Sequence, residues 1–466
     1  MKKNFLKMLV LCAVLCAAVS GAADVKPKYI FLFIGDGMSI PQRLAAEEFS
    51  KSAYGKGLAI NAMKYQALTT TSSANSFITD SAASGTAIAC GAKTNNGMIG
   101  VTPDGKKLIS VASAAKEKGR KVGIITSVTI NHATPAAFYA HNKSRGNYYQ
   151  IALEMLDSNF DYFGGGGIAK NDNKKDKKYR GDVYELAAKA GYFVSRKGGK
   201  FNEVKPDMAK VMSFGAEGDL PYAINAKKDD LLLADFLRQG IAQLENSETG
   251  FFIMAEGGKI DWCCHGNDAG SMLREVVNFD NAVRVALEFA KKHPAETLIV
   301  VTGDHETGGL TLGFAGTGYK SFISRMALQK GNAHVFRQKL ENAEKGGKMS
   351  FETAKKLAAE NFGFVFTDKT AAKDSMEITS AELKMLQKAY DSQYENGKRK
   401  RNSKGSRIMD FENACVRLIA NKSALAWTSG AHTALPVSTT SEGVGAENFT
   451  NTIDNTDIAK KLKALL

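Results

Sequence analysis

Long apolar segments are almost absent from this 466-residue chain. The one exception, Met8–Val19, is shorter than the roughly 20 residues that a transmembrane helix needs. Lysines precede this run and small residues follow it at positions 20–23, which is the pattern of a cleaved export signal. We therefore expect residues 1–23 to be a signal peptide, and the mature protein to be periplasmic or secreted without a membrane anchor.

Cysteine is also scarce. The chain has six cysteines, and the four outside the predicted signal are Cys90, Cys263, Cys264 and Cys415. No second cysteine pair has the spacing of a zinc finger, so the sequence does not favour a cysteine-bound metal. Because adjacent cysteines bridge each other only with strain, the sequence assigns no disulfide pairing.

Aromatic residues are rare where positive charge gathers. The formal net charge is +14. The basic clusters at 174–180 and 398–407 together contain a single aromatic residue, Tyr179. Surfaces that bind nucleic acid interleave aromatic and basic side chains, so we predict no binding specific to nucleic acid. The clusters are interpreted as solvated loops whose charge attracts phosphorylated anions. The run Gly164–Gly167 lacks the lysine of a phosphate-binding loop and is interpreted as a tight turn.

Short apolar runs alternate with helical patterns along the chain. The runs are Tyr29–Ile34, Val122–Thr126, Phe251–Ala255 and Leu298–Thr302, and the clearest helical patterns are Ser110–Lys118 and Arg274–Lys292. This alternation predicts an α/β protein with a covered, mainly parallel sheet. Ligands in such folds bind at the carboxyl ends of the strands, which singles out Asp36, Glu256 and Asp304.

Residues 316–426 show a different pattern. The segment Thr379–Glu382 has the sequence of a capping box, and Asp410 is placed to cap a second helix. Because metal-type side chains resume only at His432, we interpret 316–426 as a mainly helical insertion. The insertion would belong to a single domain that spans residues 24–466.

A serine and several turn segments carry the residues suited to chemistry. Ser81 opens a run of small residues, where a helix can begin and a ligand can approach the backbone. The candidate metal ligands are Asp36, Thr134, Glu256, Asp261, His265, Asp304, His305 and His432. Taken one at a time, most of these are as common in turns and caps as in metal sites. Together they supply nitrogen and oxygen donors, which favours zinc, and a hydroxyl beside metal ions favours covalent phosphoryl transfer.

Six sequence blocks, taken in order, resemble the alkaline phosphatase family. They are GDGM, TDSAASGTA, NHATPAAFYAH, EGGKIDWCCH, TGDHETGG and SGAHTALPV. The resemblance covers nearly the whole mature chain and implies a three-layer α/β sandwich around a large, mostly parallel sheet. It also implies hydrolysis of small phosphate monoesters through a phosphoserine, usually by a homodimer that holds two zinc ions and a third ion, usually magnesium.

The resemblance assigns a role to each candidate residue. Ser81 would be the nucleophile, and Arg145 would clamp the phosphate. One zinc would be held by Asp261, His265 and His432, the other by Asp36, Asp304 and His305, and the third ion by Asp36, Thr134 and Glu256.

Two positions differ from one branch of that family, which has aspartate and lysine where this chain has His132 and Trp262. We expect both side chains to border the substrate and phosphate product to be held less tightly than in that branch. We also expect His132 to shift the third site from magnesium toward zinc. The alternative function is a phosphodiesterase or nucleotide pyrophosphatase of the same superfamily, which generally lacks the third-ion ligands. A non-catalytic metal- or phosphate-binding protein would lack the nucleophile or a ligand, and none is missing.

Overall fold

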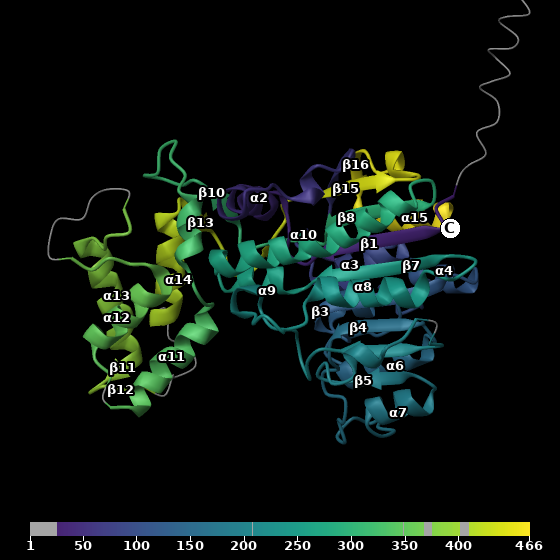
Figure 1. Cartoon of the computed structure of the whole chain (residues 1–466), viewed down its shortest axis with the longest axis horizontal. Coiled ribbons are helices and arrows are strands. Elements are labelled where there is room, and N and C mark those ends of the chain that lie inside the picture. Colours follow the sequence, from purple (N-terminus) through teal and green to yellow (C-terminus); the bar gives the residue numbers. More distant parts are fainter. Residues whose placement is uncertain (1–25, 207, 348, 368–374, 401–409) are drawn as a thin grey trace, which may run out of the picture.

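The computed structural model describes residues 26–206, 208–347, 349–367, 375–400 and 410–466 (Figure 1). The predicted signal peptide lies outside these ranges. Within them, no helix combines the length and the apolar character that a bilayer crossing requires. The four cysteines of the described chain are all buried free thiols.

A ten-stranded sheet runs through the described chain in the order β16-β2-β15-β8-β1-β7-β3-β4-β6-β5. The strands are β1 (Tyr29–Gly35), β2 (Tyr65–Thr70), β3 (Lys121–Thr129), β4 (Tyr162–Gly166), β5 (Phe193–Ser195), β6 (Val211–Phe214), β7 (Phe251–Gly257), β8 (Thr297–Gly303), β15 (Val437–Gly443) and β16 (Asn451–Asp454). Among these described strands, β15 alone runs antiparallel to its neighbours, β2 and β8. The predicted mostly parallel sheet is therefore confirmed.

Side chains of the central strand β1 alternate between two hydrophobic cores. Tyr29, Phe31 and Phe33 enter one core, and the residues between them enter the other. The first core is covered by α2 (Ile40–Tyr54), α8 (Leu233–Leu244), α9 (Lys259–His265) and α10 (Ala269–Lys292). The second is covered by α3 (Ser81–Cys90), α4 (Val111–Glu117), α5 (Ala133–Ala136), α6 (Tyr148–Asp157), α7 (Val183–Lys189) and α15 (Asn455–Leu465). Helices on both faces make the predicted three-layer sandwich.

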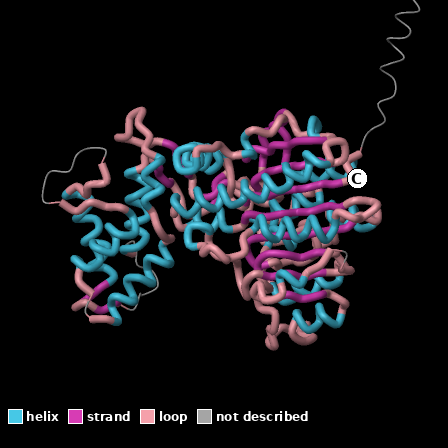
Figure 2. The backbone as a smooth tube through the Cα atoms, viewed as in Figure 1, coloured by secondary structure: helices cyan, strands magenta, loops and turns pink. Residues whose placement is uncertain are grey.

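A helical lobe stands beside the sheet (Figures 1 and 2). It lies between β10 (Leu310–Leu312) and β13 (Leu425–Trp427), which pair with each other, so the chain leaves and returns at one place. Its helices are α11 (Ala333–Lys345), α12 (Phe351–Phe362), α13 (Ser380–Gln393) and α14 (Phe411–Lys422). The capping box at the start of α13 is present as predicted. Asp410 does occupy the N-cap of α14, but its carboxylate accepts from Arg337 Nη2 (3.3 Å) instead of capping the helix.

The glycine run is a strand and not the tight turn that its composition indicated. Most of it belongs to β4, beside the irregular register of β3 between Thr126 and Thr129. A Cβ on Gly165, which has φ +114°, would lie 1.8 Å from the carbonyl oxygen of Thr126. Glycine is required there because two backbones pass too closely for any side chain.

Candidate active site

The strand ends bring the predicted carboxylates to one edge of the sheet. Gly35 of β1 is in register with Gly257 of β7 and with Gly303 of β8, so the three strands end level with one another. Asp36 and Asp304 follow directly, whereas Glu256 lies within β7 itself. All three carboxylates are fully buried. This placement follows the rule that open α/β sheets collect functional groups at their carboxyl edge.

Ser81 is the first residue of α3, and its position is set by the residue before it. The Asp80 carboxylate caps the helix by accepting from the backbone N–H of Ala83 (2.9 Å). Small residues let α3 pack closely on α5, because a Cβ on Gly85 would lie 3.3 Å from Thr134 Cα. Ser81 Oγ lies 3.2 Å from His305 Nε2. The helix N-terminus therefore presents this hydroxyl to the carboxylate edge.

Asp261, His265 and His432 form a first group of predicted ligands. Asp261 Oδ2 lies 3.2 Å from His265 Nε2, and Asp261 Oδ1 lies 3.6 Å from His432 Nε2. The Nδ1 atoms of both histidines lie 2.8 Å from backbone carbonyls, of Gly430 and Thr79, to which they donate. This leaves two Nε2 lone pairs facing each other across 3.2 Å. Such an arrangement is unfavourable unless a cation or proton lies between them, as in metal sites whose histidines are oriented through the other ring nitrogen.

Asp36, Asp304 and His305 form a second, adjoining group. His305 Nε2 lies 3.4 Å from Asp36 Oδ1 and 3.3 Å from Asp304 Oδ2. The imidazole stacks on that of His432 with ring centroids 3.7 Å apart, so the two groups share a border. Asp304 Oδ1 accepts from the backbone N–H of Gly37 (3.0 Å), which leaves Oδ2 toward His305.

Asp36 also belongs to a third group, with Glu256 and His132. Within the described chain, Asp36 Oδ1, Glu256 Oε1 and His132 Nδ1 are buried atoms without a hydrogen-bond partner. Thr134, expected here as a neutral ligand, donates from Oγ1 to Asp36 Oδ2 (3.4 Å). The sequence analysis expected His132 to border the substrate and to influence the third site, and in the structure it lies in this carboxylate cluster.

The electrostatics of these groups fit bound cations. Burial, together with the charges of neighbouring carboxylates, raises the pKa values of Asp36 and Asp304 well above their ordinary range. Burial raises the pKa of Glu256 to about 7. Burial acts in the same direction on Asp261, but the contact with His265 and the nearby imidazoles of His305 and His432 outweigh it and lower that pKa. Clustered buried carboxylates and unpaired acceptor atoms are costly without a counter-charge, so the residues present fit metal ions.

Arg145 and Trp262 lie beside the third group. Arg145 Nη1 pairs with Asp80 Oδ2 at 3.0 Å, and Arg145 Nη2 lies 3.3 Å from His132 Nε2. Trp262 is half-buried and meets the His132 ring edge-on, with centroids 5.9 Å apart. Burial, followed by the charge of Arg145, lowers the pKa of His132 to about 4, so its imidazole is neutral at neutral pH.

Two residues escaped the sequence argument although they lie inside a quoted motif. Thr307 Oγ1 donates to Asp261 Oδ1 (2.5 Å) and lies 3.2 Å from His305 Nδ1, which ties the first two groups together. The buried Glu306 carboxylate accepts from Thr433 Oγ1 and from Gln42 Nε2 (2.7 Å). In the sequence, only their position next to His305 could have indicated a role for Glu306 and Thr307. Their hydrogen-bond partners come from distant segments of the chain.

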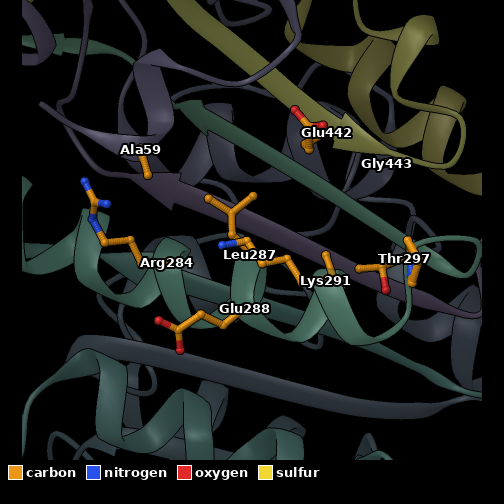
Figure 3. A pocket seen from close by; sticks show the side chains of 10 residues that line it. Ala59, Arg284, Leu287, Glu288, Lys291, Thr297, Glu442 and Gly443 are labelled. Carbon is orange, nitrogen blue, oxygen red and sulfur yellow. The ribbon is translucent and has the colours of Figure 1, made fainter.

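The pocket drawn in Figure 3 is separate from this site. It is lined by α10 residues, including Arg284 and Leu287, and by Thr297, the first residue of β8. Thr297 begins strand β8, and Gly303 ends it. This pocket therefore lies at the amino ends of the strands, opposite the carboxyl ends that carry the candidate site. It contains none of the candidate residues.

Comparison with known proteins agrees with this geometry. Residues 27–466 match the family described as alkaline phosphatase. The chain belongs to the alkaline phosphatase family. It is 31% identical over 451 residues to alkaline phosphatase 3 of Bacillus subtilis, covering 94% of this chain and 89% of that protein. By membership it is a phosphoric monoester hydrolase.

Solved alkaline phosphatases share the fold. The cold-active enzyme of the psychrophile Shewanella sp. is 28% identical with a TM-score of 0.77, and the match covers 94% of this chain and 99% of that one. The enzyme of the Antarctic bacterium TAB5 is 26% identical with a TM-score of 0.65, covering 94% and 98%. A histidine-to-glutamate variant of the TAB5 enzyme was solved with magnesium bound in its M3 site.

Proposed function

We propose that this chain is an exported alkaline phosphatase that hydrolyses small phosphate monoesters through a phosphoserine formed on Ser81. The observation that carries the proposal is the position of Ser81 Oγ, 3.2 Å from His305 Nε2, where the first two ligand groups meet. Assembly as a homodimer without a membrane anchor belongs to the same proposal and rests on the family resemblance.

The ligand groups divide into two zinc sites and a third site. Asp261, His265 and His432 would hold one zinc, and Asp36, Asp304 and His305 the other. Asp36, Thr134 and Glu256 would hold a third ion, for which the magnesium in the TAB5 variant is a precedent. The position of His132 in this third group supports a shift of its preference toward zinc. When bound, these ions lower the pKa of the Ser81 hydroxyl and neutralise the charge that develops on the phosphoryl oxygens.

The protein residues would act as follows. Ser81 Oγ gives up its proton and attacks phosphorus, the bond from phosphorus to the alcohol oxygen breaks, and that oxygen takes up one proton as the alcohol leaves. Water then attacks the phosphoserine, which releases inorganic phosphate and restores Ser81. The N-terminus of the ten-residue helix α3 favours the added negative charge at Ser81. Arg145, oriented by Asp80, would bind the equatorial phosphoryl oxygens.

The test compares a chromogenic phosphate monoester and the corresponding diester as substrates, with metal content measured on the same sample. We expect monoester hydrolysis and a phosphoserine that mass spectrometry detects on Ser81 after an acid quench. Ser113→Ala, in helix α4, is the control for Ser81→Ala, because the Ser113 hydroxyl contacts Ser110 and none of the candidate ligands. A strong preference for the diester would establish the phosphodiesterase alternative instead, and the third ligand group of Asp36, Thr134 and Glu256 argues against that outcome.

A further inference from the structure

The helical lobe contacts the chain immediately after His265. The α9–α10 junction consists of Gly266, Asn267 and Asp268. Asp268 accepts from Gln329 Nε2 (2.7 Å) and from the backbone N–H of Ala333 (3.2 Å), both in the lobe. Asn267 Oδ1 accepts from Nη2 of Arg417, in α14. The lobe therefore holds two of the three residues that lead from α9 into α10, Asn267 and Asp268.

Asn267 also contacts the segment that carries His432. Its Nδ2 donates to the carbonyl oxygens of Ser429 (2.8 Å) and Cys264 (2.9 Å). The side chain is buried, with 2% of its surface exposed, and the backbone adopts φ +51°, a conformation that asparagine tolerates better than most residues. Both amide N–H groups and the amide oxygen are thus engaged, which fixes the orientation of the amide.

These contacts lie beside the paired histidines. Cys264 precedes His265, and Ser429 precedes Gly430, whose carbonyl oxygen receives the Nδ1 proton of His265 at 2.8 Å. Without Arg417, Asn267 Oδ1 would lose its donor, and the amide could rotate away from Ser429. The relative position of the two Nε2 atoms, 3.2 Å apart, would then be less well defined.

We propose that Asn267 is a positioning residue through which Arg417 of the helical lobe sets the spacing of His265 and His432. The inference rests on the proposed zinc site. Outer residues that orient ligands typically change metal affinity by about 10–100-fold when they are removed. The lobe would then act on the metal centre from outside it and would touch no substrate.

The test is Arg417→Met, which keeps the apolar stem and removes the donor. Arg337→Met is the matched control, because Arg337 bonds to Glu412 and Asp410 within the lobe. We measure zinc transfer from the loaded enzyme to a chromogenic chelator, and the melting temperature of the metal-free protein. We expect Arg417→Met to bind zinc about tenfold more weakly, with activity restored by excess zinc. Arg337→Met should retain zinc like the wild type even where it lowers the melting temperature.

The possible failures can be told apart. Zinc retention by Arg417→Met equal to that of the wild type would overturn this inference alone. A wild-type protein that takes up no zinc would overturn the metal centre and, with it, the inference. If Arg417→Met does not fold, Asn267→Gly gives the same comparison, because glycine adopts the same positive φ and has no amide to bond Arg417 or Ser429.

Discussion

Replacement of Arg145 tests how the phosphate would be held. The guanidinium is held by Asp80 at Nη1 (3.0 Å), and its Nη2 lies 3.3 Å from His132 Nε2. Each of these nitrogens carries a second N–H, so the group can still donate two bonds to a phosphoryl group. Arg145→Ala removes both bonds and leaves the Ser81 region and the ligand groups in place.

The size of the effect follows from those two bonds. Hydrogen bonds to charged groups contribute about 1.5–3 kcal/mol each, so the loss is about 3–6 kcal/mol in transition-state stabilisation. This corresponds to a decrease of about 10²–10⁴-fold in kcat/KM. Arg145→Lys keeps the charge but not the planar fork, and we expect it to recover roughly half of the lost free energy.

The assay is steady-state hydrolysis of a chromogenic monoester, together with inhibition by inorganic phosphate and zinc content. Both the kcat/KM and the affinity for phosphate should fall, whereas zinc content should not change. Arg180→Ala, at an exposed arginine, is the control. A kcat/KM for Arg145→Ala within about threefold of the wild type would refute the assignment of Arg145 as a phosphate ligand.

Three further predictions concern the nucleophile, the substrate border and stability. Ser81→Ala should abolish phosphoserine formation and nearly all activity while zinc remains bound; activity near the wild-type level would exclude Ser81 as the nucleophile. The Trp262 and His132 ring centroids are 5.9 Å apart, so Trp262→Lys places a cation beside His132. The added positive charge should tighten inhibition by inorganic phosphate, and unchanged inhibition would contradict this prediction. Burial raises the pKa of Glu275 from its ordinary 4.5 to about 7, so the folded state favours the protonated carboxyl. The contribution of this group to the free energy of unfolding is therefore fully present below pH 4.5 and decreases by about 3 kcal/mol as the pH rises to 7. Glu275→Gln should flatten the dependence of the unfolding free energy on pH in that window, measured by denaturant titration, and the exposed Glu288→Gln should not; equal slopes in both variants would show that Glu275 is not the source.

Much of the fold was predictable because the central strands are buried on both faces. An apolar run such as Tyr29–Ile34 is a strong signal for this reason, and β1 extends it by a single residue. The antiparallel strand β15, which lies inside the sheet between β2 and β8, gave no such signal. Strand β15 carries Ser and Thr, and Thr439 Oγ1 lies 2.7 Å from the hydroxyls of both Thr69 and Thr302. Paired hydroxyls stabilise this strand, and such pairs exist only after the neighbouring strands have assembled.

The amino-acid sequence by itself determined the candidate chemistry of this protein: a serine at a helix start, histidines in turns and carboxylates at strand ends, each recognisable from neighbours along the chain. Tertiary structure alone decided how these segments are held together. His265 and His432 are separated in sequence by the whole helical lobe. The nearby residues Thr307, Glu306 and Asn267 bond to Asp261, Thr433 and Ser429, which are distant from them in sequence. The physical reason is that side-chain type is a local property, whereas hydrogen-bond satisfaction at a buried edge depends on which distant segments the folded sheet brings into contact.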